Sequence, residues 1–255
     1  MVLRMPTGIS GFDKLIDGGI PVGSIVLLAG NAGSGKTLFV SHLINSNAQF
    51  GKSLYCGFFE KKEHFIDNAM KFGLDFKKLE SEGKLIISEF FPILESGIAM
   101  LVSDIERDIN KVKPSLLVID SVSTLAGDLK GRQEVRILLK MIDSITKAYN
   151  ITVILVTELP LNVYDLGFGV EEFMADSIIM LRYVEVDGVI RRCVAVMKMR
   201  ETKHDMNINE YVIGEHGMKI KGGFKGVDGL MITSSKVRTK STENVSAEPN
   251  NEASS

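Results

Sequence analysis

The segment from Gly30 to Thr37, with the sequence GNAGSGKT, constrains this chain more than any other part of it. It fits the pattern G-x-x-x-x-G-K-[ST], between an apolar run that predicts a buried strand over 24–29 and a pattern that predicts a helix over 37–47. Glycines let such a loop wrap so that its backbone N–H groups point at phosphate oxygens, and the start of the helix adds a favourable dipole. The pattern therefore predicts a phosphate-binding loop in an α/β protein.

Two side chains of this loop have definite expected roles. Lys36 is placed to reach the β- and γ-phosphates of a nucleotide, and the Thr37 hydroxyl is placed to ligate Mg²⁺. A buried strand predicted over 116–120 ends in Asp120. Open α/β sheets bind ligands at the carboxyl ends of their strands, so we expect Asp120 to hold the same Mg²⁺ through water.

Strand and helix patterns alternate along much of the chain, which indicates one α/β domain with a mainly parallel sheet. A capped helix is expected to begin at Ser10, because Asp13 follows at capping-box spacing. The remaining expected elements are strands over 54–59, 84–90 and 152–157, and helices over 62–72, 95–111 and 133–149.

The pattern changes near the C-terminal end. Extended runs over 177–186 and 189–199 are joined by Asp-Gly, which predicts a hairpin with a type I′ turn. A short pair of strands is expected over 211–213 and 218–220. The sheet should therefore gain antiparallel strands at its C-terminal end.

Composition excludes several classes of protein. A hydrophobic fraction of 45% and a net charge of −2 are typical of a soluble globular domain and provide no global basic field for nucleic acid. No apolar run approaches the roughly 18 residues that a membrane-spanning helix needs, and the first residues lack a signal-peptide core. We expect a cytoplasmic protein with two buried free thiols, a domain over 1–233 and a disordered tail over 234–255.

Further motifs accompany the loop: GFD at 11–13 with GGIP at 18–21, IDSV at 119–122, GVEEF at 169–173 with Asp176, and KMR at 198–200 with Thr202 and His204. With these motifs in this order, the chain from Thr7 to about Ile220 resembles the KaiC-like branch of the RecA-fold ATPases. The resemblance implies a RecA-like P-loop core that binds ATP. It also implies assembly into homo-oligomeric rings, commonly hexameric, with the nucleotide between neighbouring subunits.

The resemblance also implies roles for residues near the C-terminal end. Lys198 and Arg200 would meet the γ-phosphate of a neighbour's nucleotide, with Thr202 and His204 assisting and Glu215 nearer the ribose or base. Lys198 and Arg200 share a face of the predicted strand, and the planar fork of arginine matches phosphate oxygens. The residues expected to bind nucleotide are Gly30, Gly33, Ser34, Gly35, Lys36, Thr37, Leu38, Lys198, Met199, Arg200, Thr202, His204 and Glu215.

The chain departs from its relatives at the end of the second strand. KaiC-like proteins usually carry two adjacent glutamates there, and the first is taken as the base that activates water. Here Phe59 matches the first position and Glu60 the second. Adjacent strand residues point to opposite faces, so Glu60 faces the γ-phosphate only if the strand end shifts by one. We expect Lys36, Glu60 and Arg200 to be the catalytic residues of a slow reaction.

Two other departures from the KaiC family concern the number of domains and autokinase activity. KaiC proper has two such domains in tandem, whereas this chain has no internal repeat. Glu172 and Phe173 stand where the autophosphorylating domain carries adjacent serine and threonine, so autokinase activity is not expected.

Three functions remain open. The first is a slow Mg²⁺-dependent ATPase that forms rings and serves as a regulatory or assembly module, with an unidentified protein partner. The second is a nucleotide-dependent scaffold that barely hydrolyses ATP, which Phe59 favours. The third is a recombinase-like accessory ATPase that binds DNA. Five carboxylates and no Lys or Arg between Glu158 and Asp176 argue against the third, because nucleic-acid affinity rests largely on neutralising phosphates.

Overall fold

The computed structural model describes residues 2–58, 61–90, 97–124, 132–159 and 174–224. Within these residues, nine strands form one sheet in the order β11-β10-β9-β8-β3-β7-β6-β4-β5. Their bounds are β3 (Ile25–Gly30), β4 (Ser53–Gly57), β5 (Leu85–Glu89), β6 (Leu116–Asp120), β7 (Thr152–Glu158), β8 (Ser177–Val186), β9 (Val189–Met199), β10 (Asn209–Gly214) and β11 (Gly217–Gly223).

The pairing divides the sheet into two parts. It is parallel from β5 through β4, β6, β7 and β3 to β8, and antiparallel from β8 through β9 and β10 to β11. Asp187 and Gly188, which join β8 to β9, have φ angles of 53° and 74°, as a type I′ turn requires. The predicted α/β class, with antiparallel strands added at the C-terminal end, is confirmed.

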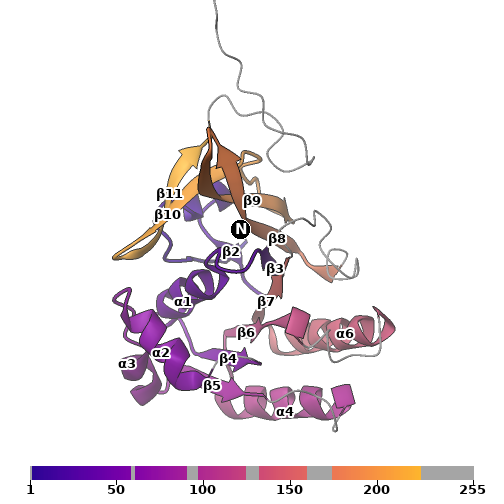
Figure 1. Ribbon diagram of the computed structural model, residues 1–255. Helices are drawn as coiled ribbons and strands as arrows, with labels where there is room; N and C mark the ends of the chain where they lie inside the picture. The colour runs from indigo at the N-terminus through magenta and orange to yellow at the C-terminus, as the bar shows by residue number, and fades with distance from the viewer. Residues whose placement is uncertain (1, 59–60, 91–96, 125–131, 160–173, 225–255) are drawn as a thin grey trace, which may run out of the picture.

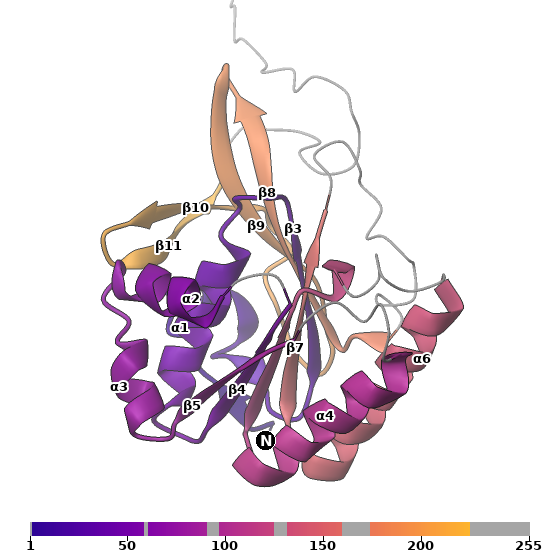
Figure 2. The ribbon, with the colours of Figure 1, turned by 60° about the horizontal axis from the view of Figure 1, so that its bottom comes forward.

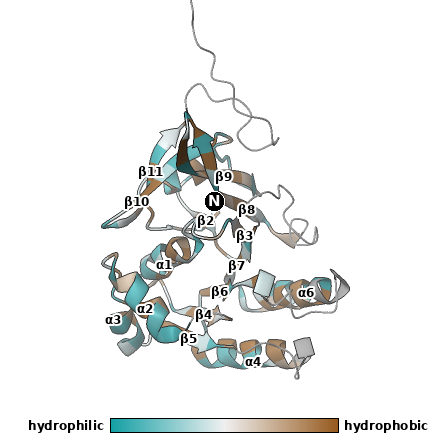
Figure 3. Cartoon of the chain, viewed as in Figure 1, coloured by the Kyte–Doolittle hydropathy of each residue, from teal (hydrophilic) through white to brown (hydrophobic). Residues whose placement is uncertain are grey.

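Helices cover both faces of the parallel part (Figures 1 and 2). One face carries α1 (Lys36–Asn47), α2 (Lys62–Met70) and α3 (Phe76–Ser81), and the other carries α4 (Gly97–Val112) and α6 (Arg132–Tyr149). A separate hydrophobic cluster fills each of the two layers. Helices α4 and α6 each show hydrophobic and hydrophilic residues along their length (Figure 3), as expected for helices with one buried side.

The N-terminal segment differs from its prediction. Instead of a capped α-helix, it contains a 3-10 helix, η1 (Asp13–Ile16), and a small antiparallel pair, β1 (Arg4–Met5) with β2 (Ile20–Pro21). Ser10 does not cap this helix. The Asp13 carboxylate accepts hydrogen bonds from the backbone N–H and hydroxyl of Thr7, at 3.0 and 2.6 Å, and so serves the preceding loop.

Two further predictions needed correction. The second strand ends at Gly57, two residues before its predicted end at 59, and the helix expected over 62–72 ends at Met70. Helix α3 was not predicted, because it spans only six residues; its start is capped by the Asp75 side chain, which accepts from the backbone N–H of Lys78 at 3.0 Å.

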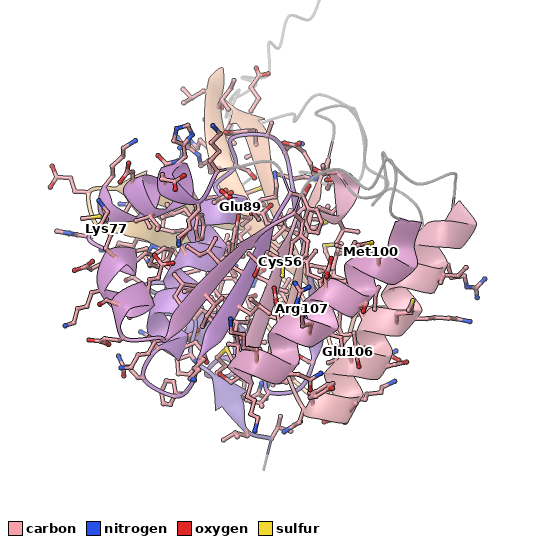
Figure 4. The ribbon with its side chains drawn as sticks, turned by 90° about the horizontal axis from the view of Figure 1, so that it is seen from below. Cys56, Lys77, Glu89, Met100, Glu106 and Arg107 are labelled. Atoms are coloured by element: carbon pink, nitrogen blue, oxygen red, sulfur yellow. The ribbon has the colours of Figure 1, made fainter. Side chains whose placement is uncertain are left out.

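Both cysteines are buried and free, as expected. Cys56 lies on β4, inside the layer that α4 covers, whereas Lys77 on α3 lies at the outer edge of the molecule (Figure 4). Burial raises the pKa of both thiols, which keeps them protonated. No helix in the described part of the chain combines the length and apolar character needed to cross a bilayer.

Candidate functional site

The predicted phosphate loop connects β3 to α1 and turns through two glycines. Gly33 and Gly35 have φ angles of 72° and 95°, which glycine adopts without steric cost. A Cβ at Gly35 would lie 3.0 Å from the Ile213 side chain, so the loop is also closely packed. The Tyr211 hydroxyl donates a hydrogen bond to the carbonyl oxygen of Ser34, and burial raises the pKa of Tyr211, which keeps that donor protonated.

The Lys36 ammonium is held inside this loop. Its Nζ donates to the carbonyl oxygens of Gly30 and Asn31 at 3.0 and 2.9 Å, and it lies 3.8 Å from Glu158 Oε1. Burial lowers the pKa of Lys36, while the negative charges of Glu158 and Asp120 oppose that shift. A cation that is partly removed from water, at the start of a helix, is suited to phosphate oxygens.

The two residues expected to hold the metal lie together. Thr37 Oγ1 donates to Asp120 Oδ2 at 3.4 Å, and the Tyr55 hydroxyl donates to the same oxygen at 3.2 Å. Hydroxyl and carboxylate oxygens are ligands that Mg²⁺ takes. Among the described residues no group of three or more His, Cys, Asp or Glu side chains gathers as a metal site.

A cavity of about 890 Å³ opens at the carboxyl edge of the parallel strands, large enough for a nucleotide. It joins the loop, the expected metal ligands and six residues that the sequence did not single out as site residues. Its lining residues are Gly33, Gly35, Lys36, Thr37, Tyr55, Lys61, His64, Asp120, Ser121, Thr124 and Glu158. Glu158 directly follows the predicted strand 152–157, the position at which parallel strands offer site residues, and that signal could have identified it.

Leu38 lies beside a second, smaller cavity of about 250 Å³ between α1 and α2. Its lining residues are Thr37, Leu38, Ser41, Phe65, Asn68, Ala69 and Phe72. Thr37 lines both cavities, so the smaller one continues from the phosphate loop along the side of α1 that faces α2.

Lys198 and Arg200 lie near the amino-terminal end of β3, whereas the phosphate loop of the same chain follows the carboxyl end of that strand. The backbone N–H of Arg200 donates to the carbonyl of Asp176 at 3.0 Å, and the N–H of Asp176 donates to the carbonyl of Ile25 at 2.8 Å. Arg200 is therefore beside the first residue of β3, whereas the loop follows the last, Gly30. With a rise of about 3.3 Å per residue, β3 separates the two by roughly 17 Å.

The two cations lie near each other at that end of β3. Arg200 Nη1 is 3.1 Å from Asp176 Oδ1, and Lys198 Nζ donates to the carbonyl oxygen of Ala175 at 2.6 Å. Burial and the neighbouring Arg200 guanidinium both lower the pKa of Lys198, and Asp176 opposes them. The Arg200 side chain is 59% exposed, which leaves it accessible to an anion from outside the chain.

The segment after β9 is held against the N-terminal part of the chain. Arg4 Nη1 donates to Thr202 Oγ1 at 3.0 Å, Thr202 Oγ1 donates to the Arg200 carbonyl at 3.1 Å, and His204 Nδ1 lies 3.3 Å from the Thr202 carbonyl. The Met199 side chain is buried in the hydrophobic core, so it does not face a ligand site.

Glu215 lies apart from Arg200. It is exposed in the turn between β10 and β11, and this hairpin packs against α1 of the same chain. The backbone N–H of Met218 donates to His42 Nε2 at 3.0 Å, and the side chains of Ile213 and Met218 approach Gly35. The hairpin therefore places Glu215 on the side of its own phosphate loop.

Several expectations lie outside the described residues. These include Phe59 and Glu60, Glu172 and Phe173, and the tail over 234–255. Of the acidic segment between β7 and β8, the structure describes the two ends, at Glu158 and Asp176.

Comparison with known proteins agrees with this geometry. The family model "ATPase: KaiC" matches residues 5–223. The chain is similar to the circadian clock protein KaiC3 of Synechocystis sp., with 34% identity over 90% of this chain and 46% of that protein. It is also similar to the circadian clock oscillator protein KaiC of Acaryochloris marina, with 30% identity over 89% of this chain and 44% of that protein. The chain thus spans less than half the length of these relatives.

Among solved structures, the KaiC-like protein PH0186 of Pyrococcus horikoshii aligns with a TM-score of 0.78 and 34% identity. The alignment covers 86% of this chain and 99% of that one, so the two share one RecA-like domain. The match of the family model over most of the chain, the identity to full KaiC proteins and the shared fold lead to the same conclusion: the chain belongs to the KaiC family of ATPases.

Proposed function

We propose that this chain binds ATP with Mg²⁺ and hydrolyses it slowly, as part of a homo-oligomeric ring that acts as a regulatory or assembly module. The observation that carries the proposal is the convergence of Lys36, Thr37 and Asp120 on one cavity at the end of the glycine-rich loop. Phosphoryl transfer needs mainly positioning and neutralisation of charge, which this set of groups is suited to supply.

In the proposed site, Mg²⁺ would neutralise charge on the β- and γ-phosphates. Thr37 and Asp120 would hold it, directly or through water, and Tyr55 would orient the Asp120 carboxylate by its hydrogen bond of 3.2 Å. Lys36 would exchange the carbonyl oxygens of its own loop for phosphate oxygens. The loop N–H groups and the first turn of α1 would bind the remaining phosphate oxygens.

The ring is supported by the separation of the two halves of the expected nucleotide site. The phosphate loop and Arg200 lie at opposite ends of β3, so Arg200 is too distant to act on a nucleotide bound to its own chain. A head-to-tail contact would bring Arg200 of one subunit to the loop of the next, and repetition with closure makes a ring. A hexamer is proposed from the resemblance to the KaiC family.

Slow turnover is proposed because Phe59 stands where relatives carry the water-activating glutamate. If this register is right, Phe59→Glu raises the rate. A nucleotide-dependent scaffold is the second candidate, and it rests on the same residue.

The decisive experiment combines three measurements on the purified full chain: equilibrium binding of a fluorescent ATP analogue, steady-state ATP turnover with and without Mg²⁺, and mass with and without ATP. We expect binding, Mg²⁺-dependent turnover at or below about 1 per second and an ATP-dependent increase in mass. Binding and assembly without turnover would support the scaffold. Turnover that rises with single-stranded DNA would support the recombinase-like alternative, and an absence of ATP binding would contradict all three.

A further inference from the structure

Two carboxylates among the described residues line the large cavity, and they come from neighbouring strands. Asp120 ends β6, and its Oδ2 accepts from Thr37 Oγ1 and the Tyr55 hydroxyl, at 3.4 and 3.2 Å. Glu158 ends β7, which lies between β6 and the loop-bearing strand β3. Asp120 is therefore hydrogen-bonded to Thr37, the expected Mg²⁺ ligand, whereas Glu158 lies near Lys36 of the loop.

The backbone of Glu158 is held on both sides. On one side it is paired with Gly30, the first residue of the loop, and the N–H of the next residue, Leu159, donates to the Gly30 carbonyl at 2.9 Å. On the other side the N–H of Glu158 donates to Ser123 Oγ at 3.1 Å, in the segment that follows Asp120. The side chain thus starts from a fixed point between the loop and the metal ligand.

From that point the carboxylate extends toward the lysine of the loop. Glu158 Oε1 is 3.8 Å from the Lys36 ammonium, the group that marks where the terminal phosphates bind. The Glu158 side chain is 55% exposed, so water from the cavity reaches its oxygens. A carboxylate near the loop lysine, with access to water and a fixed backbone, is a candidate for a general base.

We propose that Glu158 orients the attacking water in ATP hydrolysis and accepts its proton, an inference that rests on the ATPase function proposed above. The water oxygen bonds to the γ-phosphorus. The bond between that phosphorus and the oxygen bridging to the β-phosphate breaks, and its electron pair leaves on ADP. The water proton passes to the Glu158 carboxylate and then to solvent, so the products are ADP, phosphate and one released proton.

The ion pair with Lys36 has to loosen when ATP binds. Lys36 then contacts the phosphates, and the Glu158 carboxylate is released from its cationic partner toward water. A different role for the same contact would be a latch, in which Glu158 merely holds Lys36 away from the nucleotide. The rate of the chemical step distinguishes the two roles: loss of a base slows that step, whereas loss of a latch tightens ATP binding and leaves the rate unchanged.

The test measures single-turnover hydrolysis of ATP labelled at the γ-phosphate, with the full chain in excess, beside the affinity for a fluorescent ATP analogue. Glu158→Gln keeps the size of the side chain and removes its basicity. We expect the rate constant to fall by about 100-fold or more, the usual contribution of a positioned base, while ATP affinity is unchanged or tighter because a negative charge is lost. Glu158→Asp, which keeps a carboxylate one methylene shorter, should show an intermediate rate.

The matched control is Glu106→Gln, an exposed glutamate on α4 outside the residues that line the cavity (Figure 4). It should match the unmodified protein in rate and affinity. Melting temperatures of all variants should agree, since both side chains are exposed.

Each other outcome overturns a distinct statement. If the unmodified chain hydrolyses ATP and Glu158→Gln is equally fast, the inference fails while the ATPase function stands. Tighter binding at an unchanged rate would identify a latch. Binding without any hydrolysis would show that no base acts, and loss of hydrolysis in Glu60→Gln with Glu158→Gln unaffected would assign the base to Glu60. If the unmodified chain binds no ATP, the proposed function fails and this inference with it.

Discussion

At the scale of single residues, Lys36 combines burial with incomplete charge compensation. Its ammonium contacts two neutral carbonyl oxygens and lies 3.8 Å from Glu158 Oε1, and burial lowers its pKa. A bound phosphate chain would supply the missing negative charge. We therefore expect Lys36 to contribute mainly to the binding of the nucleotide.

Lys36→Ala should weaken the binding of a fluorescent ATP analogue by about ten- to a hundredfold, since hydrogen bonds to charged groups contribute about 1.5–3 kcal/mol. The control is Lys111→Ala, which removes an exposed lysine on α4 and should leave affinity unchanged. Equal affinity in both variants would contradict the assignment of the phosphate loop.

Thr37 offers a separate test of the metal site, because its Oγ1 is 3.4 Å from Asp120 Oδ2. Thr37→Ala should raise the Mg²⁺ concentration needed for half-maximal ATP binding, whereas Thr37→Ser keeps the hydroxyl and should behave as the unmodified chain. A Mg²⁺ titration of binding measures both. If the serine and alanine variants titrate alike, the hydroxyl is not a metal ligand.

At the scale of elements, the β10–β11 hairpin supports the phosphate loop. Tyr211 on β10 donates to the Ser34 carbonyl, and Met218 on β11 donates its backbone N–H to His42 on α1. Gly217 has a φ angle of 85°, and a Cβ there would overlap the His42 imidazole. The close approach of the hairpin to α1 thus depends on glycine at this position.

Gly217→Ala should destabilise the chain more than Gly222→Ala, a matched change on the same strand. Gly222 also has a positive φ, of 118°, but a Cβ there would meet nothing within 4 Å. In both variants the strained backbone conformation should lower the free energy of unfolding by about 1–2 kcal/mol. Overpacking against His42 should lower it by about 1–3 kcal/mol more in Gly217→Ala. Denaturant unfolding measures the difference, and equal losses would show that the hairpin moves away from His42 at little cost.

His42 should make the hairpin contact sensitive to pH. Burial lowers its pKa below the ordinary value of 6.5, so the folded chain keeps the imidazole neutral, with Nε2 accepting from Met218. Between the folded pKa and 6.5 the unfolded chain binds a proton that the folded chain does not. The contribution of His42 to the free energy of unfolding is therefore fully present above pH 6.5, and it decreases as the pH falls from 6.5 through the folded pKa.

His42→Gln keeps an acceptor but does not titrate, so its melting temperature should fall less between pH 7.5 and pH 5 than that of the unmodified chain. Both proteins share every other titrating group, which makes the difference specific to His42. An equal decrease in the two would mean that protonation of His42 does not oppose folding.

At the scale of the whole molecule, the candidate site residues lie at opposite ends of the central strands. One end carries the phosphate loop and Asp120, and the other carries Lys198 and Arg200, roughly 17 Å away along β3. A single chain cannot bring the two together without unfolding its central strand. In the proposed ring, ATP should therefore favour assembly, because only the assembled state offers the whole site.

Mixing two inactive variants tests this arrangement. Arg200→Ala keeps an intact loop, and Lys36→Ala keeps an intact Arg200, so a mixed ring contains some complete sites. We expect partial recovery of ATPase activity on mixing, or of ATP-dependent assembly seen by light scattering if turnover is too slow to measure. Mixed rings that form without recovery would show that Arg200 does not act on a neighbour's nucleotide.

The sequence by itself determined the features that depend on neighbours along the chain. Hydrophobic runs identified the strands of the parallel sheet, Asp187 and Gly188 identified the hairpin turn, and the loop motif located Lys36 and Thr37. These follow from local rules of periodicity and backbone conformation. The same rules failed for α3, which is very short, and for the N-terminal segment, which makes tertiary contacts such as that of Arg4 with Thr202.

Only the tertiary structure decided which distant residues meet. The position of β7 between β3 and β6 brings Glu158 beside Lys36, 122 residues earlier in the chain (158 − 36), and the packing of β10–β11 on α1 separates Glu215 from Arg200. Strand order and the docking of a hairpin depend on the burial of apolar surface between elements far apart in sequence, and no local pattern encodes that choice. For the same reason the sequence suggested a role for Arg200, whereas the fold determined that this residue faces away from its own phosphate loop.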